Sequence, residues 1–514
     1  MRRRSAIRLL CALSAFTLAF APSARAQAPT IFPANKAIAV NPDTHLVLTF
    51  SSAPTLGKSG QVRIYDAADH SLVDTLDLSI PAGPDPSRRI AAAPAVADPN
   101  APASPTTTTP AVKTTPADLH NYQLTTIGEL ADFHFYPIIL HSNVATIYPH
   151  NNVLHYRHKY IVQIDPGVFT NSFPGFTTNT AWTFATKSAP PAANATRVVV
   201  AADGTGDFST VQGAVDFVPD SPSQRVTIYI RNGTYEEIVF FRNKSNFTFR
   251  GEDRDKVQIG YANNSGFNPP MPGPSRRCAF SAYDSTGIEF LNFSVSNYAY
   301  GQAEGLLVSG SKNIVSHVNI KGSGDALNLR GPVYLTDSRI IGDGDTILGV
   351  GPAFFNHCEI QSMGPYMWIR NTGGNHGNVF LNSTFITRER PALPPQAQAA
   401  APAPATTTPA RTPMGAVLAR LPNNHGLNYP YAEAVLINCQ LKGIPAIGWG
   451  PIDDDTTHLH LWEFNSTDLD GHPIDTTQRH AVSKQLTQPQ DAQTIANYSN
   501  PAFVLGGWTP VVEP

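Results

Sequence analysis

Short runs of apolar residues, bounded by Gly, Pro, Asn and Asp, recur along most of the chain. In the first third they include residues 46–50, 61–65, 160–164 and 181–186, which are β-prone and predict strands. None of these runs has the length and the 3.6-residue period of an amphipathic helix. Short strands separated by turn residues favour an antiparallel sandwich, so we expect a β-sandwich domain over residues 28–186.

A repeat follows this segment. Each unit is apolar, then a small polar residue or Asn, then apolar again, and units lie about 20 to 25 residues apart where no insertion intervenes. Helical repeats would need long 3.6-residue periods, which these units lack. Stacked parallel strands with Asn at the turns fit better, so we expect a parallel β-helix over residues 197–511. The units lie at 288–293, 314–320, 333–340, 353–360, 379–385 and 434–441.

Three stretches rich in Pro, Ala and Thr interrupt these patterns. Residues 91–117 and 391–413 have no hydrophobic period and cannot pack a core, so we expect surface insertions there. The first would interrupt the sandwich and the second would form a loop between turns of the β-helix. Residues 187–196 are expected to form an interdomain linker.

The chain begins with the features of an export signal. Arg2-Arg3-Arg4 forms a positive region, residues 9–21 form a short apolar region, and Ala24-Arg25-Ala26 is typical of a cleavage site. We therefore expect a signal peptide over residues 1–26, cleaved near Ala26, and a protein secreted to the periplasm or beyond the cell. No later apolar run approaches the roughly 18 residues of a membrane span.

Composition and charge narrow the class of protein. Hydrophobic residues make up 41% and charged residues 15% of the 514 residues, which is typical of a globular chain. The formal net charge of −3 gives no electrostatic case for nucleic acid or for a membrane surface.

Two glycine-rich strings within the repeat carry candidate chemistry. Gly322-Ser323-Gly324-Asp325 and Gly342-Asp343-Gly344-Asp345 place Asp325 and Asp345 20 residues apart, about one turn of the solenoid. Equivalent positions on adjacent turns lie about 4.8 Å apart, and two carboxylates that close have divergent pKa values. Such a pair can supply a nucleophile and a general acid. From spacing alone, however, turn capping by both aspartates is the stronger explanation.

A resemblance to a known family favours the catalytic explanation of the two aspartates over turn capping. Residues 198–212, with the sequence VVVAADGTGDFSTVQ, resemble the opening of the pectin methylesterase family, and 228–237 and 249–252 continue the likeness. The resemblance extends over about 197–508. It implies a right-handed parallel β-helix, hydrolysis of methyl esters of galacturonate, and no metal or organic cofactor. The preceding segment resembles the Ig-like domains that bacteria append to secreted proteins.

The resemblance also implies residue roles. Asp345 falls on the family's aspartate nucleophile and Asp325 on its general acid/base. Gln302, in Gln302-Ala303-Glu304-Gly305-Leu306, is similar to the first glutamine that stabilises the oxyanion. Arg420 is similar to the arginine that keeps the nucleophile ionised.

The chain departs from the family around these residues. Gly324 replaces the second oxyanion glutamine, and Thr346 replaces the aromatic residue after the nucleophile. Trp368 and Tyr366 could supply stacking surface instead, or could pack in the core or a turn. Trp449 resembles a tryptophan that follows in the family. We therefore predict substrate contacts at Trp368, Tyr366, Trp449 and Thr346.

These features predict a carboxylic ester hydrolase that converts pectin to pectate and methanol, with the polysaccharide as its partner. We expect a monomer. Two alternatives stay open: an esterase of the same fold acting on another ester, and a non-catalytic glycan-binding β-helix.

Overall fold

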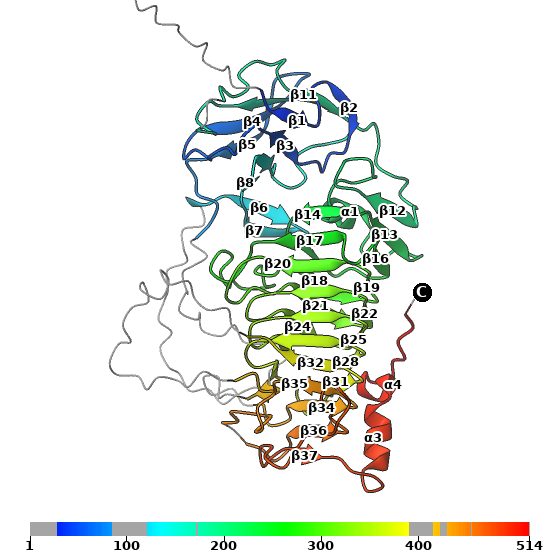
Figure 1. Cartoon of the computed structure of the whole chain (residues 1–514). Helices are drawn as coiled ribbons and strands as arrows, with labels where there is room; N and C mark the ends of the chain where they lie inside the picture. Colours follow the sequence, from blue (N-terminus) through cyan, green and yellow to red (C-terminus); the bar gives the residue numbers. More distant parts are fainter. Residues whose placement is uncertain are drawn as a thin grey trace, which may run out of the picture.

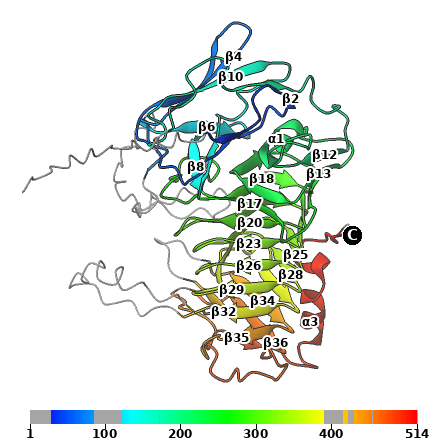
Figure 2. The same ribbon diagram turned by 45° about the horizontal axis from the view of Figure 1, so that its top comes forward.

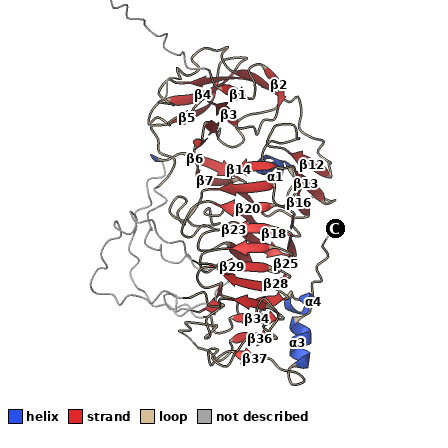
Figure 3. Cartoon of the chain, viewed as in Figure 1, coloured by secondary structure: helices blue, strands red, loops and turns tan. Residues whose placement is uncertain are grey.

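The computed structural model describes residues 28–84, 121–170, 173–389, 415–421, 429–453 and 455–512. The predicted signal peptide and its cleavage site lie outside these residues, as do both predicted insertions, 91–117 and 391–413. Strands make up most of the described chain (Figure 3). Among these residues, no helix combines the length and the apolar character needed to cross a membrane.

The larger part of the chain is a column of stacked strands, seen from two directions in Figures 1 and 2. Its strands pair in parallel with the equivalent strand of the next turn, which confirms the predicted parallel β-helix. Three sheets run along the column and enclose one continuous apolar core.

The eleven-stranded sheet holds β12 (Arg197–Val200), β13 (Val226–Ile230), β16 (Phe247–Gly251), β19 (Glu289–Leu291), β22 (Asn313–Ser316), β25 (Val333–Thr336), β28 (Ala353–Asn356), β31 (Asn378–Leu381), β34 (Glu433–Ile437), β36 (His460–Phe464) and β37 (Lys484–Gln485). The eight-stranded sheet holds β14 (Gly233–Glu236), β17 (Val257–Tyr261), β20 (Ser294–Asn297), β23 (Asn319–Lys321), β26 (Arg339–Ile341), β29 (Glu359–Ser362), β32 (Thr384–Thr387) and β35 (Gln440–Lys442). The seven-stranded sheet holds β15 (Val239–Arg242), β18 (Phe280–Thr286), β21 (Leu306–Ser311), β24 (Leu327–Arg330), β27 (Ile347–Gly349), β30 (Met367–Ile369) and β33 (Ala419–Arg420).

The polar residue in the middle of each repeat unit forms the corner between the eleven-stranded and the eight-stranded sheet. Asn292, Asp337, Asn382 and Asn438 have φ values of 62°, 50°, 50° and 53° there. Asn and Asp tolerate this left-handed conformation better than other residues with a side chain, because their short polar groups bond locally. Each repeat unit is therefore two short strands joined at one left-handed residue.

Short helices lie at both ends of the column (Figure 3). Helix α1 (Val211–Phe217) begins at Thr210, whose hydroxyl accepts a hydrogen bond from the backbone of Gly213, and its buried face adds Val211 and Val215 to the core. Helices α3 (Ala492–Tyr498) and α4 (Pro501–Val504) lie against the outside of the eleven-stranded sheet near the other end.

The N-terminal part forms two further sheets around a separate core that contains Trp182 and Phe184. All its pairs except β2–β11 are antiparallel. That this unit is Ig-like stays a prediction. One sheet has the order β1 (Thr30–Phe32), β3 (Leu46–Thr49), β9 (Val144–Ile147), β8 (Ile138–His141), and the other β2 (Ala37–Val40), β11 (Thr183–Thr186), β10 (Lys159–Ile164), β4 (Gln61–Asp66), β5 (Leu72–Asp77).

The two parts pack directly against each other. Asp43 accepts hydrogen bonds of 2.8 Å from the backbone N–H groups of Ser209 and Thr210, at the start of α1. The hairpin of β6 (Leu124–Ile127) and β7 (Leu130–His134) shares a small apolar cluster with the first turns of the column. Residues 187–196 connect the parts between β11 and β12, in the position expected for a linker.

Candidate active site

Asp325 and Asp345 occupy equivalent positions on neighbouring turns. Each lies two residues before its strand of the seven-stranded sheet, and the register pairs Leu327 with Ile347. The turns are also tied by a 3.0 Å hydrogen bond from the backbone N–H of Leu327 to the carbonyl of Thr346. The register thus brings the two carboxylates to the same edge of the sheet.

Asp345 is held by Arg420. The guanidinium Nε donates a 2.6 Å hydrogen bond to Oδ1 of Asp345, and Nη2 donates to Oδ2. This two-point contact fixes the orientation of the carboxylate. Asp345 itself has φ 46°, a left-handed backbone conformation that is uncommon outside Gly, Asn and Asp. Such backbone is concentrated at functional sites.

Trp368 completes this face of the sheet. The register pairs Asn328 with Leu348, Leu348 with Trp368, and Trp368 with Arg420, so these positions form one row across β24, β27, β30 and β33. The half-buried indole lies under the guanidinium of Arg420, 5.2 Å from the ring centre. Its N–H is buried and has no hydrogen-bond partner among the described residues.

Asp325 lies deeper than Asp345, with 7% of its surface exposed. Nη2 of Arg277 lies 3.1 Å from Oδ2 of Asp325, and Nε of Arg277 donates to both oxygens of the fully buried Glu304, at 2.9 and 2.7 Å. Burial raises the pKa of Asp325 to about 7; Arg277 opposes this rise, while the charges of Glu304 and Asp345 add to it. Near neutral pH, Asp325 can therefore both give and take a proton.

Gln302 lies in the loop between β20 and β21 and is exposed. Its carboxamide oxygen accepts a 3.0 Å hydrogen bond from the hydroxyl of Ser265. A Cβ atom added to Gly324 would lie 3.6 Å from the backbone nitrogen of Gln302, so the two expected oxyanion positions are neighbours. Gly324 has φ 68°, which disfavours a glutamine there and explains the glycine physically.

Three of the four predicted substrate contacts are wrong for this structure. Tyr366 and Thr346 are fully buried, and Trp449 is 1% exposed. The hydroxyl of Thr346 donates to Ser362, and the indole N–H of Trp449 donates to the buried Glu463. Side chains without exposed surface cannot touch a polymer, so these residues pack the core, and Trp368 alone of the four faces outward.

Sequence reasoning missed Arg277 and Glu304. Glu304 falls inside the string around Gln302, where an acidic residue flanked by apolar positions was a signal of a buried ion pair. Its partner lies 27 residues away, on the preceding turn, and only the stacking of turns brings them together.

One further cluster of possible metal ligands lies outside this region. The donor atoms of Asp468, Asp470 and His472 lie within 4.8 Å of one another after β36. Oδ1 of Asp468 accepts 2.9 Å hydrogen bonds from the backbone of Asp470 and His472, so turn formation accounts for the arrangement.

Comparison with known proteins finds a family match for the part of the chain that holds the aspartate pair. Residues 197–382 match the Pectinesterase family model. This part of the chain is similar to the pectinesterase family. The match contains Gln302, Asp325, Asp345 and Trp368, whereas Arg420 lies beyond its end.

Curated relatives agree with this match. The chain is similar to probable pectinesterase/pectinesterase inhibitor 19 of Arabidopsis thaliana, with 32% identity over 34% of this chain and 33% of that protein. Pectinesterase QRT1 of the same plant is 34% identical over 36% of this chain and 52% of that protein. The chain therefore spans about a third to a half of the length of these relatives. The solved pectin methylesterase from carrot superposes with a TM-score of 0.45 and 21% identity, covering 63% of this chain and 95% of that chain.

Proposed function

We propose that the protein is a secreted esterase that hydrolyses the methyl esters of pectin, with Asp345 as the nucleophile. The observation that carries the proposal is the pairing of two unlike carboxylates within the part of the chain that matches the pectinesterase family: Asp345 clamped by Arg420, and Asp325 buried one turn away. One is held in a fixed orientation by a guanidinium, and the other is able to exchange a proton near neutral pH.

In the first step, a carboxylate oxygen of Asp345 attacks the ester carbonyl carbon of a galacturonate unit. The bond to the methoxy oxygen breaks, and protonated Asp325 gives its proton to that oxygen, so methanol leaves. A mixed anhydride then joins Asp345 to the sugar. Arg420 contributes by holding the nucleophile in one orientation.

In the second step, water attacks the sugar's carbonyl carbon in the anhydride. The ionised Asp325 takes a proton from this water, and Asp345 departs as a carboxylate. Both residues return to their starting states, and the product is a free galacturonate carboxyl group. The two steps use only groups of this chain and water.

The pKa of Asp325 sets a pH dependence. Because Asp325 must be protonated before methanol leaves, its protonation should hold kcat/KM for methanol release nearly constant from about one unit below pH 7 downward and make it fall about tenfold per pH unit well above pH 7. The measurement is initial methanol release at several low substrate concentrations across the pH range. A profile without an alkaline limb between pH 7 and 9 would contradict Asp325 as the acid.

The oxyanion needs a second donor beside Gln302, because Gly324 cannot provide one from a side chain. The N–H of Trp368 has no hydrogen-bond partner among the described residues, and we expect the half-buried indole to turn this N–H toward the reacting ester oxygen when the substrate binds. Trp368→Phe, which keeps an aromatic ring and removes the N–H, should lower kcat about 100-fold with little change in KM.

The matched control is Trp508→Phe, at a partly buried tryptophan on the outside of the column near α3 and α4. This control should retain full activity. An unchanged kcat in Trp368→Phe would assign Trp368 to packing against the guanidinium groups of Arg370 and Arg420 instead.

The direct test of the proposed function is methanol release from highly methylated pectin by the purified mature chain. A parallel panel of acetylated glycans and thioesters tests the alternative ester chemistry that the departures from the family at Gly324 and Thr346 favour. Hydrolysis of one of these, without methanol release from pectin, would reassign the substrate. Binding of polysaccharide without hydrolysis of any ester would favour the glycan-binding alternative.

Secretion belongs to the same proposal. The predicted signal peptide supports export, and pectin lies outside the cell that makes the enzyme. N-terminal sequencing of the exported protein should begin at Gln27. A retained segment 1–26 would contradict export through cleavage at Ala26.

A further inference from the structure

We infer that the N-terminal part of the chain positions Gln302 for the reaction, through a loop of the β-helix that contacts both. This inference rests on the proposed function, because Gln302 is the residue expected to stabilise the oxyanion of that reaction. The loop comprises residues 262–279, between β17 and β18, and is called the bridging loop below. It is one of a series of corners between the eight-stranded and the seven-stranded sheet, and the next three corners carry Gln302, Asp325 and Asp345.

The N-terminal part holds the bridging loop at two points of β7. Oδ1 of Asn268 accepts a 2.9 Å hydrogen bond from the backbone N–H of His134, and Nδ2 of Asn268 donates a 3.2 Å hydrogen bond to the carbonyl of the same residue. Asn268 and His134 are only 2% and 1% exposed. Near the end of the loop, Nε of Arg276 donates a 3.0 Å hydrogen bond to the carbonyl of Ala131. Breaking such buried contacts is costly, because each leaves a polar group without a partner.

A pair of stacked rings adds to these hydrogen bonds. The ring of Phe267, in the bridging loop, lies 4.5 Å from the ring of Tyr136, and the two planes are 8° apart. Phe267 is 1% exposed and belongs to the apolar cluster that the β6–β7 hairpin shares with the column. The backbone N–H of Tyr136 also donates a 2.8 Å hydrogen bond to the hydroxyl of Tyr261, the residue directly before the loop. Tyr136 therefore fixes the place of Phe267.

The other side of the bridging loop holds Gln302. The hydroxyl of Ser265 donates a 3.0 Å hydrogen bond to the carboxamide oxygen of Gln302, and the backbone N–H of Ser265 donates a 3.2 Å hydrogen bond to its carbonyl. Because Ser265 takes the amide oxygen, the NH2 group on the other side of the amide is the one that can serve an oxyanion. The hydroxyl of Ser265 thus selects the orientation of the amide that the reaction needs.

A buried asparagine connects the two sides of the loop. Oδ1 of Asn264 accepts a 2.8 Å hydrogen bond from the backbone N–H of Phe267, and its Nδ2 donates a 2.6 Å hydrogen bond to the carbonyl of Tyr300. Asn264 is 3% exposed, so water competes little for these bonds. The ring that packs on the N-terminal part and the hydroxyl of Ser265 are two residues apart in this turn. A displacement of the ring therefore displaces the hydroxyl.

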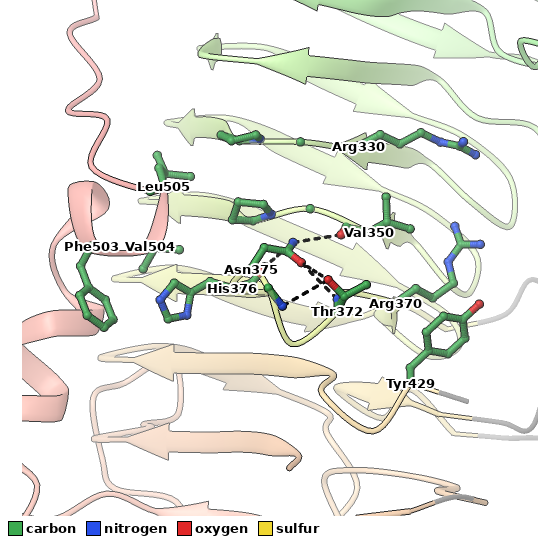
Figure 4. A pocket seen from close by; sticks show the side chains of 16 residues that line it. Arg330, Val350, Arg370, Thr372, Asn375, His376, Tyr429, Phe503, Val504 and Leu505 are labelled. Carbon is green, nitrogen blue, oxygen red and sulfur yellow. Dashed lines mark hydrogen bonds between the residues drawn. The ribbon is translucent and has the colours of Figure 1, made fainter. Parts of the chain in front are cut away.

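The opposite ends of the strands of the seven-stranded sheet have a different support. Beyond β27 and β30 the chain forms turns that line a cavity together with the end of α4 (Figure 4). Oδ1 of Asn375 accepts a 2.9 Å hydrogen bond from the hydroxyl of Thr372, and its Nδ2 donates a 3.1 Å hydrogen bond to the carbonyl of Val350. The C-terminal helices therefore lie at the end of these strands that is away from the corners with Asp325 and Asp345.

Tyr136→Ala is the variant that tests the inference, because it removes the ring beside Phe267 and leaves every residue of the β-helix unchanged. Loss of one oxyanion donor costs about 100–1000-fold in kcat, so a misplaced donor should cost part of this, about tenfold. KM should change little, since Gln302 acts on the transition state. The measurement is initial methanol release from methylated pectin over a range of concentrations, which gives kcat and KM separately.

Phe176→Ala is the matched control. Phe176 is a half-buried aromatic residue of the N-terminal part, whose ring lies edge-on to Trp182 with 5.7 Å between ring centres. Its loss should destabilise the N-terminal part and leave kcat unchanged. Tyr136→Phe, which keeps the ring, should also retain the wild-type kcat. An equal loss of kcat in Phe176→Ala would assign the effect of Tyr136→Ala to general destabilisation and overturn the inference.

A double variant tests whether the effect of Tyr136 passes through Gln302. Gln302→Ala alone should lower kcat about 100-fold. If Tyr136 acts by positioning Gln302, adding Tyr136→Ala to Gln302→Ala should lower kcat no further. Losses that multiply in the double variant would show that Tyr136 acts by another route, and would contradict the positioning role.

Hydrogen exchange gives a measurement that does not need turnover. In Tyr136→Ala, peptides that cover the bridging loop and Gln302 should exchange faster than in the wild type, and in Phe176→Ala they should not. Unchanged exchange, or a wild-type kcat, in Tyr136→Ala would overturn the inference and leave the proposed function standing. Faster exchange in Tyr136→Ala, with no methanol release by the wild type, would overturn the proposed function and retain the contact between the N-terminal part and Gln302.

Discussion

Replacing Asp345 by asparagine should reduce methanol release from methylated pectin by about 10⁴-fold or more, the scale of losing a covalent nucleophile. Asparagine preserves the size of the side chain and can still accept one hydrogen bond from Arg420. Its neutral amide cannot form the mixed anhydride, so the first step stops. The measurement is methanol release in a long incubation at high enzyme concentration, with thermal unfolding to verify the fold.

The neighbouring Asp343 provides a matched control from the same glycine-rich string. Its Oδ2 accepts a 2.8 Å hydrogen bond from the hydroxyl of Ser323, and its Oδ1 lies 3.5 Å from Arg388. Asp343→Asn therefore changes a structural carboxylate two residues before Asp345 and should retain most of the activity. Equal losses in both variants would show that the turn, and not the nucleophile, is what Asp345→Asn disturbs.

Replacing Arg277 by methionine should destabilise the protein by about 3–5 kcal/mol, the typical cost of removing one partner from a buried ion pair. Glu304 has no exposed surface, and without Arg277 its charge and that of ionised Asp325 would lack their cation. The measurement is the free energy of unfolding from urea titration at pH 8, where Asp325 is ionised.

The double variant Arg277→Met/Glu304→Met separates loss of the pair from loss of one partner. Because it removes both buried charges, it should recover most of the stability that Arg277→Met loses. For comparison, Arg339→Met breaks the exposed pair with Glu359, N–O distance 2.8 Å, and should cost less than about 1 kcal/mol. Additive losses from Arg277→Met and Glu304→Met would show that the two residues do not stabilise each other.

The β-helix could be predicted because each repeat unit is a pattern of residues that are neighbours in the sequence. The unit at 333–340 contains two apolar runs around Asp337, and the structure forms β25 and β26 with Asp337 as the left-handed corner. A corner of this kind depends on one residue and its local hydrogen bonds. The same local logic placed Asp325 and Asp345 on adjacent turns, since their spacing is one period.

Burial around the site could not be predicted in the same way. Tyr366 follows a turn, and whether its side chain points inward depends on how that turn enters β30, which the alternation of residues does not define. It points into the core, while Trp368, two residues further along the chain, lies on the outer row. The buried contacts of Arg277 and Glu304 also depend on the register between turns.

The sequence by itself determined the repeat, the corners, the family resemblance and the spacing of the two aspartates, because each is encoded within one period of the chain. The tertiary structure alone decided what surrounds them. It brought Arg420 onto Asp345 across an insertion, buried Asp325 beside Arg277 and Glu304, and placed Ser265 against Gln302. The physical reason is that pKa values and binding sites depend on the distances between side chains, and stacking alone sets these distances for residues that are far apart in sequence.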